Sequence, residues 1–109
     1  MDSNGSHLQE ALDLEIIDEK ADYRVLPGVD VVLVTIPVNA LAKELPKILD
    51  SVGEETVVID AGSTKSLLCR ILADHPKRRN FLACHPIAGT EFSGPSSAIE
   101  GLYFGKTNI

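Results

Sequence analysis

The sequence predicts an α/β fold built on a mainly parallel sheet, and three observations support this fold class. Three apolar runs have the length of short strands, at residues 30–36, 57–60 and 81–84. Segments with a helical spacing of leucine and isoleucine separate these runs, and strands that alternate with helices form a parallel sheet. The runs are nearly continuous in apolar residues, which is typical of parallel strands covered by helices on both faces.

The segment before the first strand predicts one helix. Ser6 is followed three residues later by Gln9, which is the spacing of a capping box, and the apolar residues after Ser6 follow helical spacing. We therefore expect a helix over residues 6–14 that is capped by Ser6. Residues 21–27 favour at most a very short strand, centred on residues 23–24.

Two helices are predicted between the strands, each by four apolar residues that share one face. These faces are Leu41, Leu45, Ile48 and Leu49 in the first helix and Leu67, Leu68, Ile71 and Leu72 in the second. Pro46 lies inside the first helix and is expected to kink it or split it in two. After the third strand, residues 85–101 predict a loop with a short helical turn, and residues 103–104 and 107–109 predict the start of an edge strand.

Charge and composition argue against several classes of protein. The net charge is −6, and residues 1–30 hold eight acidic and two basic residues while the remainder is balanced. Such an acidic excess does not favour nucleic-acid binding. No apolar run approaches the roughly 18 residues that span a bilayer, and the first residues lack the pattern of a secretory signal. Cys69 and Cys84 have no metal-ligand spacing, so we expect no metal site, two small buried side chains and a cytoplasmic protein.

The most informative stretch runs from His85 to Glu91 and reads HPIAGTE. It follows the third predicted strand directly, and loops that leave the carboxyl ends of parallel strands form the ligand crevice of α/β proteins. A histidine in such a loop is suited to acid–base chemistry near neutral pH. The alternative is a structural histidine at the end of a strand.

A second loop, from Asp60 to Lys65, reads DAGSTK and follows the second predicted strand. The two loops, with one helix between them, resemble those of the prephenate and arogenate dehydrogenases of tyrosine biosynthesis. The valine-rich run at residues 31–38 and the GLYFGK string at residues 101–106 fit the same family. The resemblance implies a partial Rossmann-like, doubly wound sheet, in which residues 1–109 form the C-terminal part of a dinucleotide-binding domain. We expect Lys65 to be a surface residue.

The resemblance also implies roles for individual residues. His85 matches the catalytic histidine of the family, and Ser63 matches a serine that forms hydrogen bonds near it. The alternative role of Ser63 is the N-cap of the following helix, where serine is favoured. Gly89, Thr90 and Glu91 match residues that line the substrate pocket, with Glu91 at its mouth; the alternative for Glu91 is a solvated loop acid.

The cofactor implied by the resemblance is NAD or NADP. Thr35, Ile36 and Pro37 match the strand end that passes beneath the adenine and ribose, and Asp2 matches an acid that binds the ribose hydroxyls. The 109 residues contain no Gly-x-Gly-x-x-Gly turn. The resemblance places that turn upstream of this segment. It places a helical dimerisation domain, which carries the arginine for the substrate carboxylate, downstream.

The function implied is NAD(P)-dependent oxidative decarboxylation of prephenate to 4-hydroxyphenylpyruvate, or of arogenate to tyrosine, by a homodimer. We expect the 109 residues alone to be inactive. The alternative is a small α/β binding or interaction module without catalytic activity. An upstream glycine-rich turn and a downstream helical domain would distinguish the first function from the second.

Overall fold

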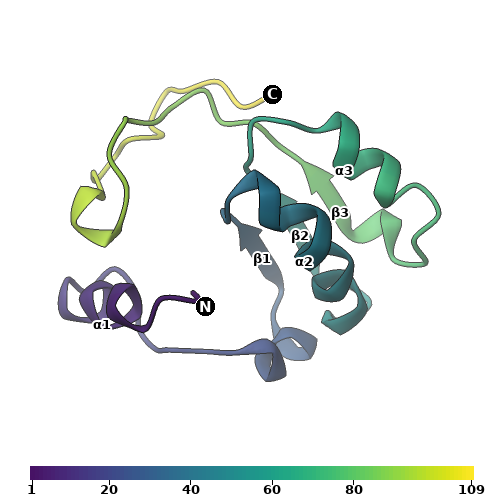
Figure 1. The fold of residues 1–109 in the computed structure, drawn as a ribbon, viewed down its shortest axis with the longest axis horizontal. Helices are drawn as coiled ribbons and strands as arrows, with labels where there is room; N and C mark the ends of the chain where they lie inside the picture. Colours follow the sequence, from purple (N-terminus) through teal and green to yellow (C-terminus); the bar gives the residue numbers. More distant parts are fainter.

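The computed structural model describes residues Met1–Ile109 and contains the three expected parallel strands. These are β1 (Val31–Val34), β2 (Val57–Asp60) and β3 (Phe81–Ala83), in the spatial order β1-β2-β3 (Figure 1). The register pairs Val34 with Asp60 and Asp60 with Ala83. The three strands therefore end side by side, and the loops that follow them leave from one edge of the sheet.

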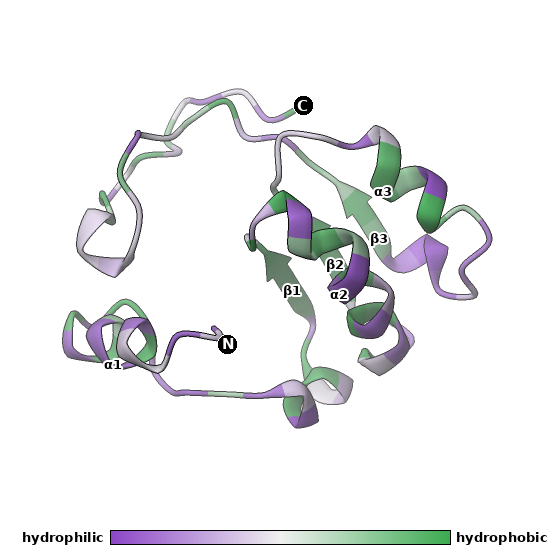
Figure 2. Cartoon of the chain, in the orientation of Figure 1, coloured by the Kyte–Doolittle hydropathy of each residue, from purple (hydrophilic) through white to green (hydrophobic).

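Helices α2 (Val38–Ser51) and α3 (Ser66–Ile71) cover one face of the sheet (Figure 1). Twelve buried apolar side chains form the core between these layers, and Figure 2 shows hydrophobic strands behind helices with mixed surfaces. α2 is one uninterrupted helix despite Pro46, so the expected split does not occur, and the alternative, a kink at Pro46, stays a prediction. The predicted apolar face of α2 is almost completely buried, and this packing outweighs the one backbone hydrogen bond that proline removes.

The opposite face of the sheet is not covered by any helix of the chain. Val31, Leu33, Val57 and Leu82 are 56%, 62%, 41% and 49% exposed. The strands thus bury alternate residues rather than both faces as their sequence suggested. The reason is that α1 (Gly5–Asp13) packs against the short 3₁₀-helix η3 (Pro95–Ser97) and not against the sheet.

Buried polar side chains fix the amino ends of the strands. The Thr56 hydroxyl donates to the carbonyl of Val29 at 2.7 Å, and the Asn80 amide donates to the carbonyls of Glu54 and Thr56, both at 2.8 Å. Each bond ties the start of one strand to its neighbour. Because buried polar groups need partners, these contacts hold the strands in register at the edge away from the candidate site.

The amino-terminal segment differs from expectation. The side chain of Asn4, not Ser6, caps α1 and accepts from the backbone N–H groups of Ser6 and His7 at 2.9 and 3.4 Å. Asparagine is among the strongest N-cap residues, and it precedes the serine that sequence spacing favoured. The segment Tyr23–Gly28 is a 3₁₀-helix, η1, instead of a short strand.

The carboxyl-terminal segment combines turns with a short antiparallel pairing. The 3₁₀-helix η3 is the expected helical turn, and residues 107–109 pair with residues 85–87 around an isolated bridge between Pro86 and Asn108. Residues 103–104 lie in a turn, so that part of the expected edge strand is wrong. Of the two cysteines, Cys84 is buried as expected, whereas Cys69 is only half-buried.

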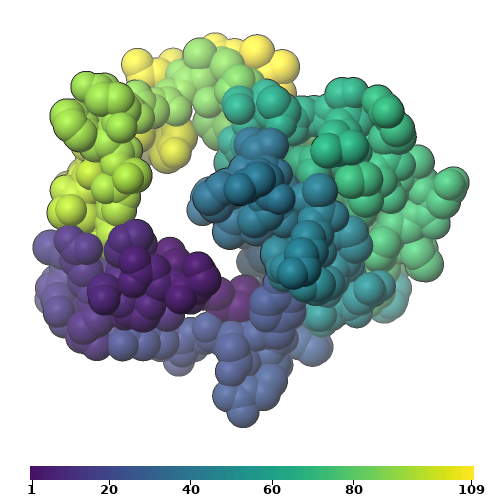
Figure 3. Space-filling model, viewed as in Figure 1, coloured from purple at the N-terminus to yellow at the C-terminus, as the bar shows by residue number.

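The space-filling view shows an opening through the molecule (Figure 3). α1 and the η3 region lie on one side of it, and α2 lies on the other, in front of β1 (Figures 1 and 3). β1 pairs only with β2 and forms a free edge of the sheet. None of the helices has the length and apolar character that a bilayer span needs.

Candidate active site

The candidate site is the edge where the three parallel strands end. Thr35 follows β1, the loop of residues 61–65 follows β2, and Cys84 and His85 follow β3. Backbone hydrogen bonds continue beyond the strands: the N–H of Ala61 donates to the carbonyl of Val34 at 3.1 Å, and that of Cys84 donates to the carbonyl of Asp60 at 2.8 Å. The loops are thus tied to one another at their first residues.

His85 is half-buried and held through its backbone. Its N–H donates to the carbonyl of Ile109 at 2.6 Å, and its carbonyl accepts from the N–H of Ile109 at 3.0 Å. The imidazole makes no hydrogen bond or ion pair within the chain, so both ring nitrogens are free to bind a ligand. A fixed backbone with a free imidazole is an arrangement that can exchange a proton with a bound molecule.

Ser63 is exposed and its hydroxyl makes no hydrogen bond within the chain. The N-cap position of α3 is occupied by Lys65, without a side-chain hydrogen bond. The alternative role of Ser63 as an N-cap is therefore wrong. Its hydroxyl is available beside the loop that carries His85.

Asp60 and Lys65 form a buried ion pair that the sequence analysis missed. The Asp60 side chain is 0% exposed, and its Oδ2 lies 2.5 Å from Nζ of Lys65, which is only 24% exposed. The expectation that Lys65 is a surface residue is wrong, because the ammonium folds back onto the end of β2. The available signal was an acidic residue that ends an apolar strand, with a lysine five positions later.

Gly89, Thr90 and Glu91 are exposed in the loop after His85. The Thr90 hydroxyl accepts from the N–H of Phe92 at 3.3 Å, and no hydrogen bond links these three residues to Ser63 or His85. The loop runs away from the sheet towards η3 (Figure 1). The structure does not bring these residues into contact with Ser63 or His85, and their substrate-binding role stays a prediction.

The residues predicted to bind the cofactor fall into two groups. Thr35, Ile36 and Pro37 lie between β1 and α2, where Thr35 and Pro37 are exposed and Ile36 is half-buried. Asp2 lies before α1, accepts from the N–H of Asn4 at 2.7 Å and lies 3.7 Å from the imidazole of His7. No hydrogen bond joins the two groups across the opening.

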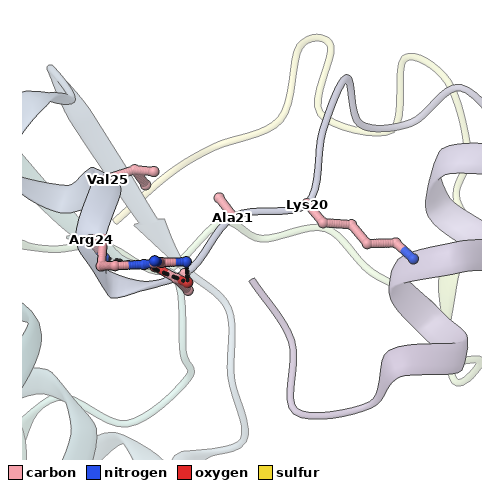
Figure 4. A pocket seen from close by; sticks show the side chains of 5 residues that line it. Lys20, Ala21, Arg24 and Val25 are labelled. Carbon is pink, nitrogen blue, oxygen red and sulfur yellow. Dashed lines mark hydrogen bonds and ion pairs between the residues drawn. The ribbon is translucent and has the colours of Figure 1, made fainter.

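A surface pocket of about 480 Å³ lies apart from this edge, where the segment after α1 meets the start of η1 (Figure 4). Lys20, Ala21, Asp22, Arg24 and Val25 line it. None of the predicted site residues is among them, and two of the lining residues, Arg24 and Asp22, form an ion pair at 2.7 Å. The strand-end loops, rather than this pocket, therefore hold the groups suited to catalysis.

Comparison with known proteins decides the family. Residues 1–109 match the family model described as prephenate dehydrogenase, nucleotide-binding domain. The chain belongs to this family. The prephenate dehydrogenase of Bacillus subtilis (strain 168) is 34% identical over an alignment that covers 85% of this chain and 26% of that protein. The cyclohexadienyl dehydrogenase of Zymomonas mobilis subsp. mobilis is 28% identical and covers 68% of this chain and 25% of its own length.

Solved structures of the prephenate dehydrogenase family have the same fold. The Aquifex aeolicus prephenate dehydrogenase, in complex with hydroxyphenyl propionate and NAD⁺, matches 98% of this chain and 38% of its own with a TM-score of 0.82 and 33% identity. The Synechocystis arogenate dehydrogenase matches 97% of this chain and 38% of its own with a TM-score of 0.78, and its 20% identity shows likeness of fold alone. By the coverages given above for the Bacillus subtilis and Zymomonas mobilis proteins, the chain spans about a quarter of the length of its curated relatives.

Proposed function

We propose that this chain supplies the catalytic histidine and part of the cofactor surface of an NAD- or NADP-dependent dehydrogenase. In this proposal residues 1–109 are the C-terminal part of a dinucleotide-binding domain. The reaction is the oxidative decarboxylation of prephenate to 4-hydroxyphenylpyruvate, or of arogenate to tyrosine. The observation that carries the proposal is the free imidazole of His85, held next to the Ser63 loop where adjacent parallel strands end.

His85 is the proposed acid–base residue. The imidazole of His85 accepts the proton of the substrate hydroxyl as the carbon that bears it loses a hydride and becomes a carbonyl carbon. The bond from the ring to its carboxylate then breaks and carbon dioxide leaves. The electron pair of that bond makes the ring aromatic, and the oxygen takes back a proton from the imidazolium to form the phenol. Ser63 donates or accepts a hydrogen bond at the same hydroxyl. Gly89, Thr90 and Glu91 are proposed to line the remainder of the substrate site from their loop.

The proposed cofactor surface is the end of β1. Thr35 and Pro37 are exposed there, and the free edge of β1 faces the opening seen in Figure 3. Ile36 packs beneath the end of β1. The half-exposed carboxylate of Asp2 is suited to binding ribose hydroxyls. When bound, NAD or NADP takes the hydride from the substrate. The helical domain proposed to form the homodimer lies outside these residues.

Replacing His85 with asparagine in the dehydrogenase that contains this chain tests the proposal. General acid–base groups contribute about 10²–10⁴-fold to a rate, so kcat for prephenate or arogenate should fall by about that factor. The dissociation constant for NAD or NADP should change little, because the imidazole is assigned to the substrate. Steady-state kinetics with both substrates and both cofactors, and titration of the cofactor, measure the two effects.

His75→Asn is a matched control, since His75 lies beyond the end of α3 that is farther from the Ser63 loop, where its imidazole lies 3.3 Å from the carboxylate of Asp50. It should leave kcat unchanged. A His85→Asn enzyme with the activity of the parent would overturn the assignment, and a parent enzyme that oxidises neither substrate would overturn the proposed function.

A further inference from the structure

The side chain of Asp60 organises the loop that carries Ser63. Its Oδ1 accepts from the backbone N–H of Gly62 at 2.8 Å, and its Oδ2 pairs with the ammonium of Lys65. Gly62 directly precedes Ser63, so the carboxylate fixes the loop from both sides of the serine. A buried carboxylate is tolerated only when it is paired and hydrogen-bonded, and this requirement restricts the loop to conformations that keep both contacts.

The backbone carbonyl of Asp60 connects the same loop to the loop of His85. It accepts from the N–H of Cys84 at 2.8 Å and from Nζ of Lys65 at 3.0 Å. Cys84 directly precedes His85. The ammonium of Lys65 therefore contacts both the side chain and the backbone carbonyl of Asp60. Through these two groups, Asp60 is bonded to the Ser63 loop and to the start of the His85 loop.

Close packing leaves the loop little room to adopt another position. A Cβ atom at Gly62 would lie 3.0 Å from Oδ1 of Asp60 and 3.2 Å from Cδ1 of Leu41. Leu41 is 0% exposed in the core face of α2. The loop is therefore held between the Asp60 carboxylate and a helix that cannot move without disturbing the core.

We propose that Asp60 and Lys65 are positioning residues that hold Ser63 and His85 in a fixed relation to each other. Neither touches the substrate; both act through the backbone of the two loops. This inference rests on the proposed function, in which Ser63 and His85 act on one substrate hydroxyl. The competing role for Lys65 is direct contact with an anionic group of the substrate or cofactor, since one of its three N–H donors is not used by Asp60.

Hydrogen–deuterium exchange of the 109-residue chain tests the structural part of the proposal. Lys65→Met should speed amide exchange about tenfold at residues 61–64 and 84–85, while the core amides of α2 change little. Lys65→Arg keeps the charge and the donors and should restore most of the protection. Lys47→Met is the matched control, because it breaks the exposed pair of Lys47 with Glu44 at 2.8 Å, and it should leave both loops unchanged.

The double variant Asp60→Asn/Lys65→Met covers the case in which the single variant does not fold. It leaves no unpaired charge in the interior, and an asparagine oxygen can still accept from the N–H of Gly62. The loop of residues 84–85 should still exchange faster, because the contact of Lys65 with the Asp60 carbonyl is lost. Two results would overturn the proposal. One is exchange that rises equally over the whole chain in both variants, and the other is exchange that rises at neither of the two loops.

Kinetics in the dehydrogenase that contains the chain separate positioning from direct binding. A positioning role predicts that Lys65→Met lowers kcat about 10- to 100-fold with KM within about twofold, and that Lys65→Arg recovers most of kcat. A raised KM, with unchanged exchange at both loops, would assign Lys65 to ligand contact and overturn the proposal. If the parent enzyme oxidises neither substrate, the proposed function fails, whereas the exchange result stands independently.

Discussion

Single polar residues, rather than the apolar core, fix the arrangement of the strand ends. Thr56 and Asn80 connect neighbouring strands where they begin, and Asp60 connects the loops where the strands end. All three side chains are buried. Removing the partner of any of them would destabilise the fold, because an unsatisfied buried polar group is costly. Apolar packing positions whole elements, but these directional contacts determine which backbone atoms face one another.

A different ion pair makes a prediction about pH. Hydrogen bonds from the side chain and backbone N–H of Arg24, together with its charge, hold the pKa of Asp22 at about 2, below its usual value of 3.8. Because the pKa of Asp22 is lower in the folded state than in the unfolded state, its ionised carboxylate stabilises the fold at pH values above the unfolded-state pKa of about 3.8. This stabilisation is lost as the pH falls from about 3.8 to about 2. The pair is exposed to solvent, so its effect on overall stability is expected to be small.

Arg24→Ala should therefore raise the pKa of Asp22 towards its usual value with little change in the melting temperature at neutral pH. Titration of the side-chain carboxyl carbon by NMR measures the pKa. Lys20→Ala is the control, since the ammonium of Lys20 bonds to Gln9 rather than to Asp22. An Asp22 pKa that stays near 2 in the Arg24 variant would contradict the prediction.

Elements with a strong pattern could be predicted from the sequence, and elements decided by tertiary contacts could not. β2 begins and ends where expected for residues 57–60, because apolar β-branched residues stop abruptly at a glycine-containing loop. η1 was missed because Asp22 caps it and accepts from the N–H of Arg24 at 2.9 Å, a local contact without periodicity. α2 survives Pro46 through its buried face, which no local propensity describes.

The candidate site was predictable to a similar degree. Its position followed from the rule that loops at the carboxyl ends of parallel strands bind ligands, and the structure places Ser63 and His85 there. The pairing of Lys65 with Asp60 depends on how the loop turns back over β2, which spacing alone does not give. The position of residues 89–91 depends on contacts other than those with Ser63 and His85, and the role of these residues is still a prediction.

The free edge of β1 predicts self-association of the isolated chain. An apolar edge strand with unpaired N–H and C=O groups can pair with another chain, and Val31 and Leu33 expose apolar side chains beside it. The 109-residue chain should form dimers or larger species at high concentration. Leu33→Lys should shift it towards monomer without loss of the fold, because Leu33 is 62% exposed. Sedimentation velocity over a range of concentrations measures the distribution.

Leu67→Lys is the control for this experiment. Leu67 is also exposed, at 54%, but it lies on α3, away from the β1 edge. The control should self-associate as the parent does. A parent chain that stays monomeric and unfolds cooperatively at high concentration would contradict the prediction.

At the scale of the whole molecule, the chain presents the candidate site at one edge of its sheet and an opening beside β1. α2 and α3 cover one sheet face, the other face is bare, and β1 has one free edge beside the opening (Figures 1 and 3). Such an arrangement can hold proton-transfer groups in place. It cannot by itself enclose a substrate or exclude water, which electrostatic catalysis requires.

The 109-residue chain on its own is therefore expected to be catalytically silent. Pyrophosphate is bound in dinucleotide folds by a glycine-rich turn at a helix N-terminus, and these residues contain no Gly-x-Gly-x-x-Gly turn. Without that contact NAD or NADP should bind too weakly to be held over β1, and His85 would have no hydride acceptor to work with. Incubation of the purified chain with prephenate or arogenate and each cofactor should give no reduced nicotinamide above a protein-free blank. The same assay on the dehydrogenase that we propose contains the chain is the positive control. Reduced cofactor that is formed by the chain alone and lost on His85→Asn would contradict the prediction and show that the strand-end loops suffice for catalysis.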